Sequence, residues 1–255
     1  MTKIRQFTPL EINHLNRYGH RKIDYKNLGE KPVEYITNIA EFHHLSFYVN
    51  QNVLIPRIES EKIIDLALTF AKENFDVSTQ LSVADICCGS GCLGISFFLA
   101  LKDAGFTKVE LILTDISTKA LDVTKMNCQK LLPFDANYSI LESDMLTNLP
   151  ETSKFDILLS NPPYIPSDRI SKLDSSVKDF EPHLALDGGP LGNTLINKLI
   201  AQLPKHVQKS SISIIEIDYL HNMKAFTLPN VFDVEILKDD SGLNRYLVLT
   251  PTQDK

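Results

Sequence analysis

The sequence lacks any apolar run of membrane-spanning length, and its first residues lack the apolar core of a secretory signal. A transmembrane helix needs about 20 apolar residues, so we expect no membrane partner. Cysteine is also scarce, and the four cysteines are bunched between residues 87 and 128 rather than spaced like disulfide partners. This predicts reduced thiols and a cytoplasmic protein, although Lys3 and Arg5 near the start leave a mitochondrial location open.

Basic residues are outnumbered by acidic ones, which gives a net charge of -6 over 255 residues. Domains that bind nucleic acid usually carry a basic surface, so we expect no stable nucleic-acid partner. There is no internal repeat and no low-complexity tract. The length allows one large domain and a small one, and we expect a short N-terminal region at 1–52 and a main domain at 53–255.

From residue 81 onward, strand-like and helical segments alternate. Strands are predicted at 81–86, 109–114, 138–141, 155–159, 211–217, 232–237 and 245–249, and helices at 92–102, 117–131 and 193–209. This alternation predicts an α/β fold with a doubly wound, mostly parallel, seven-stranded sheet. Residues 238–244 are too few for a parallel crossover, so the last strand is expected to run antiparallel.

The N-terminal region predicts a different kind of structure. Residues 1 to about 30 suggest one or two short helices, and the alternation of aromatic and polar residues over 31–50 suggests a β-hairpin. His43 and His44 would then be neighbours on a strand and point to opposite faces, which does not suit a shared metal ion. We expect no metal site here or at Cys87-Cys88, where adjacent thiols face the same difficulty.

A glycine turn lies between the first predicted strand and its helix. Gly89-x-Gly91-x-x-Gly94 matches a dinucleotide-binding pattern, and Asp115 ends the second strand, about twenty residues beyond. Glycines let the backbone approach a ligand closely, and an acid at that position binds ribose hydroxyls. A tight turn with no ligand is the alternative. Together, the turn and Asp115 indicate a cofactor that contains adenosine.

Two further acids bear on which cofactor this is. Asp85 precedes the glycines, and a carboxylate there would oppose a pyrophosphate but would suit the ammonium and sulfonium groups of S-adenosylmethionine. Alternatively, Asp85 stabilises the helix dipole. Asp144 ends the third strand and is expected to accept hydrogen bonds from an adenine amino group, unless it is an ordinary loop aspartate.

The stretch Asn161-Pro162-Pro163-Tyr164 follows the apolar run 155–160. The two prolines remove two backbone donors and fix two φ angles, so the loop is rigid. Ligands in open α/β sheets bind at the carboxyl ends of strands, where this loop is predicted to lie. A turn in which Asn161 caps its own backbone is the alternative reading.

Beside a sulfonium, this loop suits a planar nitrogen, either an amide or an exocyclic aromatic amine. The Asn161 side-chain oxygen and the Pro162 carbonyl can accept its two N–H groups. Tyr164 can stack on the planar group or face the cationic sulfur. We therefore predict catalytic roles for Asn161, Pro162 and Tyr164, a place at the substrate for Pro163, and a contact of Asn161 with the cofactor.

On these and other motifs the chain resembles the N5-glutamine methyltransferases of the HemK type. The motifs are Pro32–Thr37, Val53–Glu61, the glycine turn, Ser160–Pro166, Phe180–Gly189 and Lys238–Arg245. The segments around Arg57 and Glu181 indicate glutamine, since the proline loop is shared with other amino-group methyltransferases. The resemblance implies the S-adenosylmethionine-dependent methyltransferase fold, a substrate-docking role for 1–52, and a place at the substrate for Arg57.

The function that the resemblance implies is transfer of a methyl group from S-adenosylmethionine to the glutamine of a Gly-Gly-Gln motif in class-1 peptide chain release factors. Ribosomal-protein glutamine methylation and adenine N6 methylation are the alternatives within methyl transfer. A dinucleotide-dependent dehydrogenase leaves the proline loop unexplained, and a non-enzymatic binder of a translation factor is a further alternative. The usual first glycine of the turn is Cys87 here, and we expect cofactor binding to suffer if φ at this position is positive.

Overall fold

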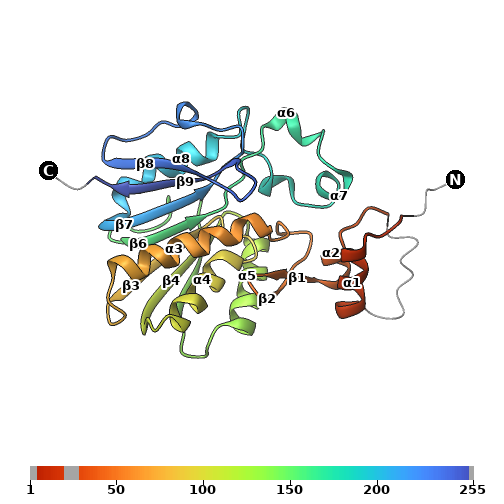
Figure 1. Ribbon diagram of the computed structural model, residues 1–255, viewed down its shortest axis with the longest axis horizontal. Coiled ribbons are helices and arrows are strands. Elements are labelled where there is room, and N and C mark those ends of the chain that lie inside the picture. Colours follow the sequence, from red (N-terminus) through yellow and green to blue (C-terminus); the bar gives the residue numbers. More distant parts are fainter. Residues whose placement is uncertain (1–4, 20–28, 253–255) are drawn as a thin grey trace.

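A seven-stranded sheet forms the centre of the computed structural model, which describes residues 5–19 and 29–252 (Figure 1). The strands are β3 (Gln80–Ile86), β4 (Lys108–Asp115), β5 (Asn137–Glu142), β6 (Phe155–Ser160), β7 (Val207–Glu216), β8 (Phe232–Lys238) and β9 (Asn244–Pro251). Their spatial order is β5-β4-β3-β6-β7-β9-β8. β9 lies between β7 and β8 and pairs antiparallel with both, whereas the other pairs are parallel. The predicted α/β fold, with its antiparallel last strand, is confirmed.

Helices cover both faces of this sheet because the apolar residues of its central strands point to alternate sides. Helices α3 (Glu61–Asn74), α4 (Cys92–Asp103) and α5 (Thr118–Leu131) pack on one face. Helix α8 (Thr194–Gln202) packs on the other. In β6, Ile157 and Leu159 face the first layer, and Leu158 faces the second. All three side chains are fully buried, so β6 lies in the middle of the core.

The N-terminal region contains helix α1 (Pro9–Tyr18), helix α2 (Val33–Thr37) and the hairpin of β1 (Ile39–Phe42) and β2 (Leu45–Tyr48). The Thr8 side chain and Glu11 form a capping box that begins α1. The structure therefore confirms one helix within 1–30, while 20–28 lies outside the described residues. The predicted hairpin is present but shorter, because Val33–Thr37 forms a helix that ends at Asn38 in the left-handed conformation, φ 58°.

The placing of His43 and His44 on a strand was wrong. Both residues form the turn of the hairpin, with φ of 46° and 62°, and their ring centroids lie 5.8 Å apart. A two-residue turn with two positive φ angles matches the twist of the flanking strands. Among the described residues there is no group of three or more histidine, cysteine or acidic side chains arranged to hold a metal ion.

Asn127 connects the hairpin to the main sheet layer. Its Oδ1 accepts from the Tyr48 N–H at 2.7 Å, and its Nδ2 donates to the carbonyls of Tyr48 and Ser90 at 3.0 and 2.9 Å. Asn127 belongs to α5 and its side chain is fully buried. Its amide gives the Tyr48 backbone the two hydrogen bonds that a neighbouring strand would otherwise provide. The boundary at residue 52 stays a prediction.

The segment between β6 and β7 differs from expectation at both ends. The helix predicted at 193–209 stops at Gln202, because Pro204 has no N–H to continue it, and β7 already begins at Val207. Short helices that were not predicted fill the chain before it: α6 (Ser167–Ile170), α7 (Ser175–Lys178) and the 3-10 turn η3 (His183–Ala185). Two further 3-10 turns, η2 (Ile58–Ser60) and η4 (Leu203–Lys205), flank α3 and α8, and η5 (Met223–Ala225) follows β7.

Figure 1 shows α1 and α2 at the same end of the molecule as α6 and α7. The parallel strands direct their carboxyl termini toward this end, because α6 follows the carboxyl end of β6. No helix in the described part of the chain is long and apolar enough to cross a membrane.

Candidate functional site

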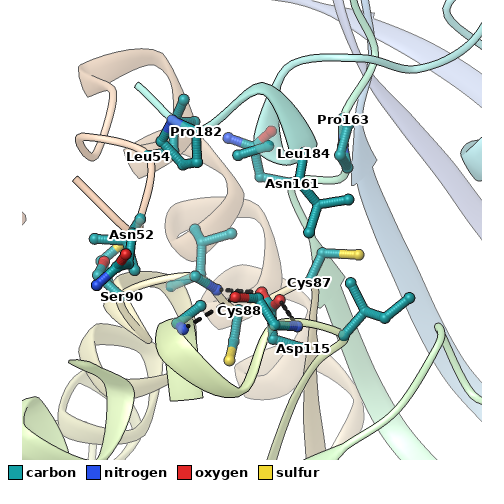
Figure 2. A pocket seen from close by; sticks show the side chains of 18 of the residues that line it. Asn52, Leu54, Cys87, Cys88, Ser90, Asp115, Asn161, Pro163, Pro182 and Leu184 are labelled. Atoms are coloured by element: carbon teal, nitrogen blue, oxygen red, sulfur yellow. Dashed lines mark hydrogen bonds between the residues drawn. The ribbon is translucent and has the colours of Figure 1, made fainter. Parts of the chain in front are cut away.

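A cavity opens at the carboxyl ends of β3, β4 and β6, where sequence patterns had predicted a ligand. It is lined by parts of the segments 52–60, 87–93, 115–120, 143–145, 161–163 and 182–195. Figure 2 shows Asp115 and Asn161 on opposite sides of the cavity in that view, with Cys87 between them. The glycine turn and the proline loop, 70 residues apart in sequence, therefore face one common space.

The glycine turn leaves room for a ligand. Gly89 has φ +54°, which favours glycine, and a Cβ added there would meet no atom within 4 Å. Gly91 has φ +78° and caps α4, but a Cβ there would come within 3.0 Å of Thr124 Cγ2. Gly89 thus faces open space in the cavity, whereas Gly91 is required by the turn and its packing; Gly91 does not line the cavity.

Cys87 occupies the position where the resembling family has glycine, and its φ is +60°. This is the positive value for which we expect weakened cofactor binding, because a side chain with a Cβ is strained in the left-handed region. Its sulfur lies 3.5 Å from the Met145 sulfur. Burial, followed by the charge of Asp115, raises the pKa of the Cys87 thiol well above its usual value, so the thiol is uncharged.

Asp85 lies behind the turn and is not among the residues that line the cavity. The residue is fully buried, and its Oδ2 accepts from the Gly94 N–H at 2.8 Å in the first turn of α4. Its Oδ1 has no hydrogen-bond partner among the described residues. Burial raises the pKa of this carboxyl to about 7. Gly94 is required beside it, since a Cβ there would lie 2.8 Å from the Asp85 Cβ.

Asp115, at the end of β4, lines the cavity and holds the turn in place. Its Oδ2 accepts from the Gly89 N–H at 2.9 Å, and its Oδ1 accepts from the Ser117 N–H at 2.9 Å. A carboxylate oxygen has more than one lone pair, so each oxygen can still accept from a ligand hydroxyl. The acid predicted for a ribose therefore reaches the cavity beside the glycine turn.

Asp144 also lines the cavity, but it forms an ion pair with Lys198 of α8 that the sequence did not reveal. Both side chains are about 40% exposed, so the pair contributes little to stability. Asp144 is placed beside Ser143 and Met145 in the loop after β5. Its predicted contact with an adenine amino group stays a prediction.

Asn161 is held in one orientation by a neighbour from the N-terminal side of α3. Its Nδ2 donates to the Ser60 Oγ at 2.9 Å, and the Asn161 Oδ1 has no partner among the described residues. Ser60 also lines the cavity, and its own Oγ donates to Glu216 Oε2 at 2.5 Å. The acceptor predicted for a planar N–H group is therefore present in the cavity wall.

The rest of the proline loop is more buried than the predicted roles imply. Pro163 lines the cavity, whereas Pro162 and Tyr164 do not. The Tyr164 hydroxyl donates to Glu216 Oε1 at 2.9 Å, and its ring packs beside the apolar layer that contains α8. The structure therefore gives the Tyr164 hydroxyl a structural partner, while the proposed stacking on a planar substrate stays untested.

Arg57 lies in the segment before α3 that lines the cavity, and it forms an ion pair with Glu181. Arg57 Nη2 lies 2.6 Å from Glu181 Oε1, and Glu181 Oε2 accepts from the Ile55 N–H at 3.2 Å. The Glu181 side chain is 1% exposed. The two segments that indicated glutamine in the sequence are thus joined to each other.

Sequence reasoning missed Ser60 and Glu216. Glu216 lies at the end of β7, is 1% exposed, and burial raises its pKa, although the hydrogen bonds from Ser60 and Tyr164 act to lower it. The available signal was an acid at the end of a strongly apolar strand, which needs a buried partner. Ser60 gave no such signal, because a serine before a helix is common.

The residues present fit S-adenosylmethionine. The open space at Gly89 lets a ligand approach the backbone closely, and Asp115 presents carboxylate oxygens beside it. Asp85, whose pKa is raised to about 7, lies next to the same turn, and a positively charged ligand would favour its ionised form. A positively charged ligand suits this surrounding better than a pyrophosphate does.

Comparison with known proteins gives consistent results. Residues 54–177 match the family described as methyltransferase small domain. The release factor glutamine methyltransferase of Leptospira interrogans serogroup Icterohaemorrhagiae serovar Lai is 35% identical over 246 residues, which cover 94% of this chain and 82% of the relative. The protein of the same name from Clostridium acetobutylicum is 36% identical over 211 residues, 82% of this chain and 69% of the relative.

Among solved structures, the ribosomal protein L11 methylase of Lactobacillus delbrueckii subsp. bulgaricus aligns with a TM-score of 0.51. The alignment covers 78% of this chain and 81% of that chain at 18% sequence identity. At this identity the likeness shows a shared fold.

The strain at Cys87 is testable with two substitutions that both remove the thiol. We expect the free energy of unfolding of Cys87→Gly to be about 1 kcal/mol higher than that of Cys87→Ala, because only glycine adopts φ +60° without cost. Urea denaturation of the two variants measures the difference. If alanine gives the more stable protein, the backbone at this position is not strained.

The raised pKa of Asp85 predicts a pH dependence of stability. The folded carboxyl titrates at about 7, above its value in the unfolded chain, so the folded state binds more protons in between and stability falls as pH rises to 7. Asparagine does not titrate. The free energy of unfolding of Asp85→Asn, relative to that of the parent, should therefore rise by roughly 2–4 kcal/mol between about pH 4.5 and pH 8. Urea unfolding at several pH values measures this. A gain that does not vary with pH, or an equal gain in the exposed control Asp103→Asn, contradicts the assignment.

Proposed function

Because the chain belongs to the release factor glutamine methyltransferase family, we propose that it methylates the side-chain amide of a glutamine in a class-1 peptide chain release factor. The observation that carries the proposal is the Asn161 amide. Its oxygen is unpartnered, and it shares a cavity with the glycine turn and Asp115. An acceptor for a planar N–H group next to a nucleoside-type pocket is what such a transfer requires.

S-adenosylmethionine supplies an electrophilic methyl group on a positively charged sulfur. On the proposed assignment, Gly89 gives the cofactor close access to the backbone, Asp115 accepts from its ribose hydroxyls, and Asp144 accepts from its adenine amino group. Asp85 acts from behind the turn, where its Oδ2 accepts from the Gly94 N–H. Gly91 shapes the turn from outside the cavity wall.

The target amide is a poor nucleophile because its nitrogen lone pair is delocalised. On the proposed assignment the Asn161 Oδ1 accepts one of its N–H groups, which turns the nitrogen toward the methyl group and favours loss of a proton from it. The Pro162 carbonyl is predicted to accept the other N–H, although Pro162 does not line the cavity in this structure. Pro163 forms the wall of the cavity beside Asn161, and Arg57 also lines the cavity. The prolines keep these acceptors in place between turnovers.

Two other substrates share the chemistry of this loop. A glutamine in a ribosomal protein presents the same amide, and an adenine presents an amino group of similar geometry. The names of the relatives favour the release factor. An adenine in duplex nucleic acid must also be flipped out of its stack, and the net charge of -6 gives little support for holding a polyanion. A cytoplasmic location and a docking role for 1–52 belong to the same proposal.

The substrate is tested with purified protein, S-adenosylmethionine carrying a labelled methyl group, and a class-1 release factor. We expect label on the glutamine of the Gly-Gly-Gln motif, located by mass spectrometry of the digested product. A release factor with that glutamine replaced by alanine is the control and should stay unlabelled. Label on a ribosomal protein or on adenine, with none on the release factor, contradicts the proposal.

The role of Asn161 is tested by Asn161→Ala. We expect methyl transfer to fall by about 100-fold or more, because the target amide loses an acceptor that orients it in the transition state. Cofactor affinity, measured by calorimetry, should stay within about 3-fold, since the side chain faces the target. If cofactor binding is lost together with activity, Asn161 belongs to the cofactor pocket instead.

A further inference from the structure

The Asn161 amide has two nearly identical ends, and only one of them suits the proposed reaction. The oxygen end accepts an N–H from a target amide, whereas the NH2 end would oppose it. Both ends have a similar shape, so the cavity walls alone do not select between them. Some contact must therefore determine which end faces the cavity.

Such a contact leads away from the cavity into the sheet. The Asn161 Nδ2 donates to the Ser60 Oγ at 2.9 Å, and the Ser60 Oγ donates to Glu216 Oε2 at 2.5 Å. The other oxygen of Glu216 accepts from the Tyr164 hydroxyl at 2.9 Å. Ser60 and Glu216 are 2% and 1% exposed, so water does not replace these partners.

The direction of this chain of hydrogen bonds is set by its buried end. Both oxygens of Glu216 accept, Oε2 from the Ser60 hydroxyl and Oε1 from the Tyr164 hydroxyl. Ser60 has a single hydroxyl hydrogen and must give it to Glu216, so its oxygen is left to accept from Asn161. The NH2 end of Asn161 is thereby drawn to Ser60, and the oxygen is turned the other way.

We propose that Glu216 and Ser60 are positioning residues that fix the Asn161 amide with its oxygen toward the target glutamine. The proposal rests on the proposed function and deepens it, since neither residue touches the reacting atoms. It also explains why a carboxylate is retained at the end of β7, where desolvation makes a charge costly. A carboxylate of purely structural use would serve the fold without any effect on the orientation of Asn161.

Glu216→Gln changes the direction of the hydrogen bonds but hardly changes the shape of the side chain, because glutamine has nearly the same size and carries an NH2 group. That group can donate to Ser60, which frees the Ser60 hydroxyl to donate to Asn161 Oδ1 and reverses the amide. We expect kcat for glutamine methylation to fall by about tenfold or more, with cofactor affinity within about 3-fold. Thermal unfolding of the variant checks that it is folded.

Ser60→Ala is the second test, since it removes the hydroxyl that links Glu216 to Asn161 by hydrogen bonds. Alone it should lower kcat, because the amide then samples both orientations. In the Ser60→Ala background, adding Glu216→Gln should lower kcat by less than about twofold further. A structural role for Glu216 predicts the same additional loss in both backgrounds, and that result overturns the proposal. Ser60→Thr keeps the hydroxyl and should restore most of the activity.

Ser213→Ala is the matched control. Ser213 lies on the same strand as Glu216, is buried, and its hydroxyl has no hydrogen-bond partner among the described residues. We expect its kcat to equal that of the parent protein. A loss comparable to that of Ser60→Ala would show that any buried hydroxyl near β7 matters, which contradicts a specific relay.

A readout independent of activity keeps the two proposals distinguishable. The side-chain amide of Asn161, identified by NMR from the signal that Asn161→Ala removes, should exchange its hydrogens slowly in the parent protein. Exchange should accelerate by about tenfold or more in Ser60→Ala and in Glu216→Gln, because the donated hydrogen bond is lost. Equal exchange rates in all three proteins overturn the relay, even if the parent methylates no release factor. Altered exchange in a protein without that activity supports the relay and refutes the function.

Discussion

The ion pair of Arg57 and Glu181 joins two segments that both contribute to the cavity wall, and the site depends on it. The two residues are 124 positions apart, yet Arg57 Nη2 lies 2.6 Å from Glu181 Oε1 and the second oxygen holds the Ile55 N–H. The Glu181 carboxylate is almost fully desolvated, so loss of its partner would leave a buried charge at a cost of about 3–5 kcal/mol. The pair therefore keeps the segment before α3, which carries Ser60, against the loop that contributes Pro182 and Leu184 to the wall.

The proline loop is supported from behind by glycines, and not by its prolines alone. A Cβ on Gly188 would lie 2.7 Å from the Pro163 oxygen, and one on Gly192 would lie 2.2 Å from the Tyr164 oxygen. Backbone hydrogen bonds of Ile165 with Leu186 and Gly188 join the same two segments. The prolines limit the conformations of the loop, while this close packing fixes where the loop stands in the fold. That division explains how the loop at the carboxyl end of β6 can hold Asn161 in a defined position.

Local patterns in the sequence predicted the features whose causes are local. Alternation of apolar segments predicted the sheet, and the short link before β9 predicted its direction, because both follow from chain geometry. The placement of Asp115 at the glycine turn followed from the strand ends in the same way. The orientation of Asn161 did not, because Ser60 lies 101 residues away and is joined to it only in the folded state. The histidine turn and the early end of α8 were missed because turn type and Pro204 override the apolar period.

The conformation of Cys87 is a further consequence of tertiary packing. Its neighbour Cys88 donates its N–H to the Thr114 carbonyl at 2.9 Å, and on the other side the Ser160 hydroxyl donates to the Ile86 carbonyl at 2.7 Å. Contacts on both sides of the turn thus fix its path, and a residue between them must adopt the left-handed conformation whether or not it is glycine. The turn therefore keeps its shape at the expense of strain in one residue. That strain is carried by the backbone of Cys87, while Gly89 stays open toward the cavity.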